Sequence, residues 1–290
     1  GFHDFKRGRR LESIRFYDRG LSIYRLLSAE NPQCLYRYAA ESGTIGFLMS
    51  ATNEYQPRSA ELLRQAVAIW KRLEQEQPGK YRVEYATACD NLGYQLSLSH
   101  DVATHREAEA VLREALAIRQ QLYQQDPGRF RRDYAWTADN LGKVLTRDSG
   151  SFAEAEELLR TALQLREEMN RESGGKNISE VAWTCHNLGQ LLAKKPEYAA
   201  EAEQCYRTSI RLRQKLEQLS PGTHAADTSW VMFWLAELLS HDPARHAETG
   251  ELYCAALEIQ QKVEQEHPGM FVLNIDRIRE RYESFRNGIQ

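Results

Sequence analysis

The chain of 290 residues is 42% hydrophobic and 27% charged, and its formal net charge at pH 7 is -3. A balance this close to neutral gives no bulk attraction to nucleic acid or to an anionic membrane. No apolar run approaches the roughly 20 residues of a membrane span, and the five cysteines lack metal-type spacing. We therefore expect a cytoplasmic protein whose cysteines are small core residues.

A small residue recurs along the chain at spacings of 46, 49, 47, 47 and 47 residues. Its six positions are Gly20, Ala66, Ala115, Ala162, Ser209 and Ala256. Apolar residues follow three and seven positions later in every copy, for example Ile118 and Leu122 after Ala115. These offsets lie on one stripe of a helix, so each copy contains an amphipathic helix, named helix B here.

A second pattern with the same period predicts a second helix, named helix A here. It is a Leu-Gly pair or a close variant, at residues 45–46, 92–93, 141–142, 188–189 and 235–236. Glycine inside a helix costs about 1 kcal/mol relative to alanine, so its recurrence needs a structural reason. We predict a close approach to a neighbouring helix here, because only a missing side chain admits it.

Turn signals separate the predicted helices. Pro-Gly or Gly-Gly pairs follow helix B at residues 78–79, 127–128, 174–175, 221–222 and 268–269. Before or at the start of helix B, Thr104–Glu107 and Ser151–Glu154 predict capping boxes, and Asp242-Pro243 predicts an N-cap with a first turn. Since strand signals are absent and the loops are short, consecutive helices must lie antiparallel.

These signals predict an all-α chain, an α-solenoid in which antiparallel helix pairs form a right-handed superhelix. In chain order we expect a leading helix B, five helix A/helix B repeats and a charged C-terminal capping helix. Their ranges are 1–31, then 32–78, 79–127, 128–174, 175–221 and 222–268, then 269–290. The start inside a helix B leaves two interpretations open, a piece of a longer protein or a native half-repeat.

Helix B with its small residue, followed by helix A with Asn-Leu-Gly, resembles the tetratricopeptide repeat. The resemblance is carried by residues 115–119 with 140–142, and by weaker copies at 162–166 with 187–189 and at 66–70 with 91–93. The repeat is most similar to the subtype of kinesin light chains and many bacterial signalling proteins. Its period exceeds the roughly 34 residues of the family standard, which predicts longer helices. The resemblance implies a concave groove, lined by helices A, that binds a peptide or protein.

Enzyme signatures are absent from the sequence. It contains no P-loop, G-x-G-x-x-G, H-E-x-x-H or G-x-S-x-G motif. His100 and His105 share one loop and His241 and His246 share another, but neither pair has a suitably placed third metal ligand. We therefore expect no catalytic residue, no cofactor and no metal site.

The residue before the leucine of helix A is asparagine in three repeats, at Asn91, Asn140 and Asn187. A carboxamide both donates and accepts hydrogen bonds, so a ladder of three would hold an extended peptide by its backbone. Peptide-binding members of the family have such a ladder, and these positions match it. The alternative is that each asparagine bonds to the backbone of a neighbouring helix.

Charged side chains flank the predicted ladder. Lys143, Arg147 and Lys194 fall on the same predicted side and form a basic patch, which Asp90 and Asp139 oppose. We expect all five to contribute to the peptide-binding surface, although the aspartates also fit ordinary groove-lining positions without a ligand.

Three tryptophans share one position of the repeat, five residues before the leucine of helix A. They are Trp136, Trp183 and Trp230. Two interpretations compete for them. The rings either pack between successive repeats as core, or line the C-terminal half of the groove as an apolar stripe for partner side chains.

The sequence thus favours a protein–protein interaction scaffold that binds a peptide or protein in its groove. One alternative is a sensor module of a larger signalling or effector protein whose activity lies in another domain. A helical RNA-binding array is disfavoured, because the predicted groove carries charges of both signs.

Overall fold

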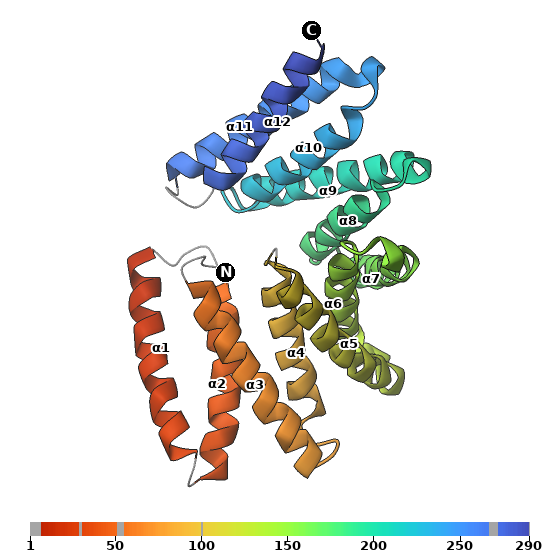
Figure 1. Cartoon of the computed structure of the whole chain (residues 1–290). Coiled ribbons are helices and arrows are strands. Elements are labelled where there is room, and N and C mark those ends of the chain that lie inside the picture. The colour runs from red at the N-terminus through yellow and green to blue at the C-terminus, as the bar shows by residue number, and fades with distance from the viewer. Residues whose placement is uncertain (1–6, 29–30, 51–54, 100, 267–271, 290) are drawn as a thin grey trace. The chain divides into compact units, whose positions relative to one another are not determined.

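The computed structural model of the chain describes residues 7–28, 31–50, 55–99, 101–266 and 272–289. Over these ranges about 88% of the residues are helical, and none is in a strand. Within residues 7–145 and within residues 152–289, consecutive helices pack as antiparallel neighbours joined by short loops (Figure 1). The predicted all-α fold of helix pairs is therefore confirmed.

Helix A and helix B alternate through the described residues. The B helices are α1 (Arg7–Leu27), α3 (Gln56–Glu76), α5 (Val102–Gln125), α7 (Phe152–Glu172), α9 (Ala199–Leu219) and α11 (His246–Glu266). The A helices are α2 (Pro32–Ser50), α4 (Arg82–Ser97), α6 (Pro127–Leu145), α8 (Ile178–Leu192), α10 (Ala225–Leu239) and α12 (Val272–Ile289). Short 3₁₀ turns precede three of the B helices, at η2 (Ser149–Ser151), η3 (Pro196–Tyr198) and η4 (Pro243–Arg245).

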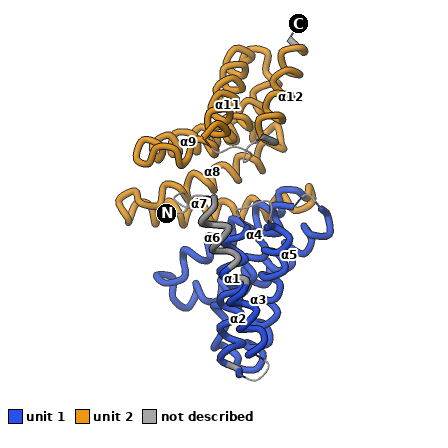
Figure 2. Tube along the Cα trace, turned by 90° about the vertical axis from the view of Figure 1, so that its left-hand side faces the viewer, with its two compact units in different colours: residues 1–147 blue, residues 148–290 orange. Residues whose placement is uncertain are grey.

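The chain divides into two compact units, residues 1–147 and residues 148–290 (Figure 2). Unit 1 contains α1 to α6 and unit 2 contains α7 to α12. Within each unit every helix packs against the next one along the chain, and α4 also contacts α2 and α6. An A helix in the middle of unit 1 is therefore covered on most of its sides.

Helix α6 begins at Pro127, one residue before the start that we expected for its repeat. The carboxylate of Asp126 explains this start, because it accepts a hydrogen bond from the Arg129 amide at 3.0 Å. Proline suits the first helical position, since its missing N–H would have no partner there.

The glycine of helix A marks a close contact with helix B of the same pair. A Cβ atom added to Gly93 would lie 2.3 Å from Leu112 Cγ on α5, far inside van der Waals distance. The same test gives 2.8 Å from Gly46 to Leu63 Cγ, and 2.8 Å from Gly189 to Tyr206 Cε1. The predicted close approach is confirmed for these three pairs.

Leu63, Leu112 and Tyr206, the side chains that lie against these glycines, share one position, three residues before the small residue of helix B. We call the side chain at this position the knob, and the same position holds Leu159 in α7 and Tyr253 in α11. All five are almost completely buried. The small residues at 66, 115, 162, 209 and 256 are also fully buried, whereas a Cβ on Gly20 of α1 would meet open space.

The starts of two B helices differ from the prediction. Asp101, not Thr104, caps α5, because its carboxylate accepts from the Thr104 amide at 2.8 Å. Ser151 makes no capping hydrogen bond, since the Asp148 side chain instead accepts from the Gly150 amide and starts η2. The predicted capping boxes are therefore wrong. The predicted N-cap at Asp242 is confirmed, with the Ala244 amide 2.9 Å from its carboxylate.

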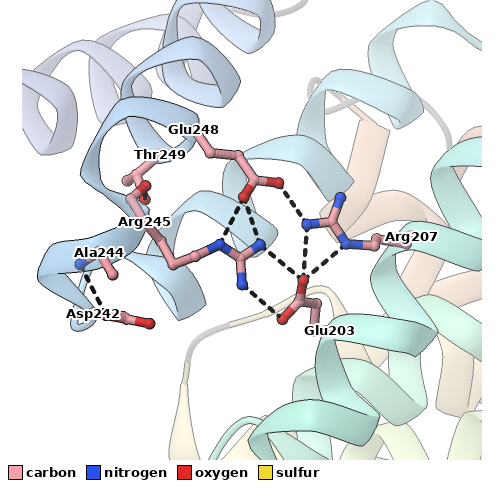
Figure 3. A network of polar contacts seen from close by, with 7 residues as sticks. All are labelled: Glu203, Arg207, Asp242, Ala244, Arg245, Glu248 and Thr249. Atoms are coloured by element: carbon pink, nitrogen blue, oxygen red, sulfur yellow. Dashed lines mark hydrogen bonds and ion pairs between the residues drawn. The ribbon is translucent and has the colours of Figure 1, made fainter.

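Ion pairs join neighbouring B helices at a fixed position of the repeat. The arginine lies two residues before the small residue of one helix B. Its glutamate partner lies eight residues before the small residue of the next helix B. These pairs are Arg64–Glu107, Arg160–Glu201 and Arg207–Glu248. In unit 2 the last pair extends into a network, because Arg245 also contacts Glu203 and Glu248 (Figure 3). Hydrogen bonds from Arg245 and Arg207 lower the pKa of Glu203, and those from Arg207 and Arg245 lower the pKa of Glu248.

Alanine at Gly93 will destabilise the chain by about 1–3 kcal/mol, because its methyl group must displace the Leu112 knob. Gly250 in α11 is the matched control, since a Cβ there meets nothing within 4 Å. Gly250→Ala will therefore stabilise the chain by about 0.5–1 kcal/mol through helix propensity alone. Urea unfolding measures the free energy of unfolding of both variants. An equal change in the two would contradict a close contact between Gly93 and Leu112.

Acid will weaken the four-charge network of unit 2. Because the folded-state pKa values of Glu203 and Glu248 are lowered, the carboxylates contribute stability above the ordinary value of about 4.3. That contribution is lost as the pH falls through the lowered pKa. The melting temperature of the wild type will therefore fall more steeply below about pH 5 than that of Glu203→Gln/Glu248→Gln. The measurement needs low salt, because salt screens exposed ion pairs. Parallel curves of melting temperature against pH for the wild type and the double variant would mean that the network contributes nothing to stability.

Candidate peptide-binding surface

One narrow stripe of α4, the A helix in the middle of unit 1, stays open to solvent. On α4, between residues 85 and 97, only Thr87, Asn91 and Tyr94 are not buried. Their spacing of four and three residues places them on one face of the helix. We define the A-helix stripe of unit 1 as these three residues with Phe47 of α2 and with Trp136 and Lys143 of α6, all of which are also only partly buried.

Aromatic rings run across the stripe from helix to helix. The ring of Tyr94 lies 6.0 Å from that of Phe47 on one side and 6.0 Å from that of Trp136 on the other, between centroids. The ammonium of Lys143 lies 5.7 Å from the centroid of Tyr94. Burial lowers the pKa of Lys143. The negative charge of Asp139 opposes this shift, and the positive charge of Arg147 adds to it. The stripe therefore combines a continuous apolar strip with one cation.

The three asparagines of the predicted ladder differ in exposure. Asn91 is half-buried on the stripe, whereas Asn140 on α6 and Asn187 on α8 are each only 2% exposed. The amide nitrogen of Asn140 has no hydrogen-bond partner among the described residues. A buried donor left without a partner costs about 1–3 kcal/mol. Asn91 is thus the most exposed of the three asparagines, and Asn187 belongs to the other unit.

Asp90 does not lie on the stripe but beneath it. Its Oδ2 accepts from Arg119 Nε at 3.2 Å and Nη2 at 3.1 Å, and its Oδ1 accepts from the Thr137 hydroxyl at 2.6 Å. Burial raises the pKa of Asp90 to about 6 against the opposing charge of Arg119. Asp139 is also fully buried. The prediction that these two aspartates line the surface is corrected accordingly.

Arg119 connects this buried carboxylate to the stripe. Its guanidinium also donates to the Thr87 hydroxyl at 2.8 Å and to the partly exposed carboxylate of Asp133 at 3.1 Å. The sequence did contain a signal for it, in the residue four positions after the small residue. That residue is buried in every copy after the first, at Trp70, Arg119, Arg166, Arg213 and Gln260. A long polar side chain recurring at a helical core position was the missed indication of a buried network.

The predicted basic patch separates into residues with different roles. Lys143 lies on the stripe beside Tyr94. Arg147 is exposed, and its guanidinium donates to the Ser99 carbonyl at 2.6 Å, which ties the end of α6 to the loop after α4. Lys194 is exposed and lies in unit 2. In unit 1 the patch therefore consists of Lys143 on the stripe and Arg147 after the end of α6.

All three tryptophans of the shared position are partly buried, so neither competing interpretation holds in its pure form. Trp136 contacts Tyr94 of the preceding A helix. In unit 2, the Arg213 guanidinium lies 5.9 Å from the Trp183 ring. Trp230 stacks on Phe233 with centroids 5.0 Å apart. Each ring thus packs against neighbouring side chains and leaves part of its surface open.

Helix α12 contributes an arginine to the tryptophan cluster of unit 2. Arg277 of α12 lies 5.4 Å from the Trp230 ring and 5.3 Å from the Trp234 ring. Cation–π contacts of this kind contribute about 0.5–1 kcal/mol where they are exposed. The aromatic surface of unit 2 is therefore covered in part by the chain itself.

Within the described ranges, no cluster of three or more His, Cys, Asp or Glu side chains is arranged to hold a metal ion. None of the helices described is long and apolar enough to cross a membrane.

Comparison with known proteins identifies the repeat. A family model described as a tetratricopeptide repeat matches residues 135–170, which cover part of α6 and most of α7. The crystal structure of BtubC (BKLC) from P. vanneervenii is similar, with a TM-score of 0.56 at 16% identity, over 97% of this chain and 92% of that one. No curated protein sequence matches the chain.

A second solved structure, of a putative kinesin light chain from Podosopora anserina with nearly identical TPR-like repeats, has a TM-score of 0.53 at 17% identity. The match covers 78% of this chain and 96% of that one. The similarity at this identity concerns the fold. Together with the matched repeat, it confirms the resemblance to tetratricopeptide repeats of the kinesin light-chain type.

Removing Arg119 alone will destabilise the fold more than removing both partners of its ion pair with Asp90. Arg119→Met leaves the Asp90 carboxylate buried without its partner, which costs about 3–5 kcal/mol. The double variant Asp90→Asn/Arg119→Met removes both charges and should be more stable than the single variant. The wild type, the single variants Asp90→Asn and Arg119→Met, and the double variant form a double-mutant cycle, which urea unfolding measures. Additive effects in this cycle would contradict the direct coupling of the two side chains.

Proposed function

We propose that this tetratricopeptide-repeat chain is a protein–protein interaction scaffold, and that the A-helix stripe of unit 1 binds an extended peptide segment of its partner. The observation that carries the proposal is the continuous strip of Phe47, Tyr94 and Trp136 across three A helices. Aromatic rings that keep part of their surface open are typical of interaction surfaces, where they bury much apolar area with little loss of side-chain entropy.

The spacing of the rings suits an extended ligand. Alternate side chains of a β-strand point to the same side and lie roughly 6.6 Å apart, since each residue advances about 3.3 Å. The rings of the strip are 6.0 Å apart. Every second side chain of an extended peptide that crosses the A helices can therefore rest on the aromatic strip.

Polar groups beside the strip complement the backbone of such a peptide. The carboxamide of Asn91 supplies one donor and one acceptor next to Tyr94, as the peptide N–H and C=O groups require. The hydroxyl of Thr87 is held by Arg119, which fixes the floor of the stripe. A nucleic-acid ligand is less well supported, because Asp133 and Glu84 border the surface together with Lys143.

The proposal is tested by selecting 12-residue peptides from a random displayed library on the wild-type chain. Tyr94→Ala will weaken the selected peptides about tenfold or more, as loss of a central aromatic contact at an interface does. Asn91→Ala will cost about 0.5–1.5 kcal/mol of binding energy, the value of one hydrogen bond. Fluorescence anisotropy of a labelled peptide measures both effects.

Tyr123 is the matched control for Tyr94. Its ring is also partly buried, but it lies on α5, a B helix, where it stacks on Tyr134 with centroids 5.1 Å apart. Tyr123→Ala will leave peptide affinity unchanged. Selected peptides that bind Tyr94→Ala as well as the wild type, or that lose affinity for both variants alike, would refute binding on the stripe.

A further inference from the structure

Unit 2 contains a cavity where α10, α11 and α12 meet. Its volume is about 270 Å³. Its walls are formed by Ser240 after α10, by His246 and Tyr253 of α11, and by the face of α12 between Arg281 and Gly288. The three helices pack against one another in chain order (Figure 1). Hydroxyl groups, an imidazole and aromatic rings therefore surround one space.

Three residues in the walls of this cavity have equivalents in unit 1. Positions are compared by counting from the leucine of helix A, whose place Tyr282 takes in α12, and from the small residue of helix B. The equivalents of Ser240, His246 and Gly288 are then Ser97, His105 and Arg147. Unit 1 thus has a guanidinium side chain at the position where unit 2 has a glycine.

In unit 1 the arginine side chain binds the groups that correspond to the walls of the cavity. Arg147 Nη1 donates to the Ser99 carbonyl at 2.6 Å, and Nη2 donates to the Ser97 carbonyl at 3.4 Å. Nη1 also lies 3.5 Å from His105 Nδ1. The guanidinium therefore joins the C-terminal end of α4 to the start of α5. It is the group that this position of the repeat accommodates.

The glycine itself leaves this position open in unit 2. The other described copies hold a larger side chain there, at Leu98, Arg147, Lys194 and His241. A Cβ atom added to Gly288 would meet nothing within 4 Å. His241 is exposed although α11 follows it in the same unit, so a following helix does not cover this position. The cavity is therefore a space without the side chain that lines it elsewhere in the repeat.

The charges around the cavity suit a cation. Ser240 directly follows α10 and Gly288 lies in the last turn of α12, so two of the three helix ends here are C-terminal ends, where the partial charge is negative. The positive charge of Arg281 is offset, because its guanidinium lies 2.6 Å from the Glu237 carboxylate. Phe285 adds an aromatic ring, and the face of such a ring attracts a guanidinium.

We propose that this cavity is a binding site for an arginine side chain of a partner protein. The guanidinium of the bound arginine takes the place that Arg147 has in unit 1, donates to the Ser240 carbonyl and lies beside His246. Arginine suits the site better than lysine, because its planar fork donates to several acceptors at once. The cavity belongs to unit 2 and the A-helix stripe to unit 1, so the proposal does not rest on the peptide-binding function.

Titration of the isotope-labelled chain with N-acetyl-arginine amide tests the proposal by nuclear magnetic resonance. The control is N-acetyl-citrulline amide, which has nearly the same shape without the charge. The arginine probe will bind with a dissociation constant on the order of 1 mM, as suits a ligand of this size, and will shift the amide signals of Ser240, His246, Ser284 and Gly288. The citrulline probe will bind at least about tenfold more weakly, because charge-assisted hydrogen bonds are the stronger ones. Equal binding of the two probes, or unchanged signals at these four residues, overturns the proposal.

Substitutions of Gly288 locate the binding. Gly288→Arg supplies the side chain that the equivalent position carries in unit 1, so it will fill the cavity and weaken the arginine probe at least about tenfold. Gly288→Ala is the matched control, because its methyl group meets nothing within 4 Å and leaves the affinity unchanged. Both variants will melt at or above the temperature of the wild type, since glycine is a poor helix former. Binding that survives in Gly288→Arg, or that is lost equally in Gly288→Ala, would place the probe elsewhere and contradict the assignment of the cavity.

Discussion

The contact between the glycine of helix A and the knob of helix B is the constraint on which the rest of the fold depends. At Gly93 the Leu112 side chain occupies the space that any other residue would need for its own Cβ. The two helices of a pair can therefore lie close together, and α4 is also flanked by α2 and α6. Between residues 85 and 97, what remains open on α4 is the single stripe of Thr87, Asn91 and Tyr94. The candidate surface follows from the packing, because the residues left uncovered by it are the ones that a partner can touch.

Much of this arrangement could be predicted from the sequence. A small residue recurring every 46 to 49 positions indicated helix B, and a glycine that helix propensity disfavours indicated the close contact. The register was less certain at the level of single residues. Adjacent positions on a helix are rotated by about 100°, so Asp90 points into the protein while Asn91 beside it stays partly open. A pattern that locates a helix face to within one position cannot separate such neighbours.

Interactions between repeats could not be predicted from the sequence, for a different reason. The ion pairs between B helices connect Arg64 with Glu107 and Arg207 with Glu248, which are more than 40 residues apart. Whether such charges meet depends on the rotation between one repeat and the next. The longer period of this chain prevents that rotation from being transferred from shorter tetratricopeptide repeats. The partial burial of Trp136 has the same origin, because its neighbour Tyr94 lies in the preceding repeat.

The buried network below the stripe links stability to the candidate surface. Arg119 pairs with Asp90 in the interior and donates to Thr87 on the stripe. A buried ion pair adds little net stability compared with apolar side chains, but its directional hydrogen bonds fix how the helices face each other. In unit 1 this pair connects α5 with α4, and Thr137 extends it to α6. Helices α4 and α6, two of the three A helices that carry the aromatic strip, are therefore joined by polar contacts beneath it.

Site-specific photo-cross-linking tests peptide binding on the stripe most directly. A benzoylphenylalanine residue replaces Tyr94 in one preparation and Tyr123 in another, and each is irradiated with the selected peptide before mass spectrometry. Binding on the stripe predicts cross-links from position 94 to one defined segment of the peptide and none from position 123. Cross-links from both positions alike, or from position 123 alone, would contradict the assignment of the stripe as the binding surface.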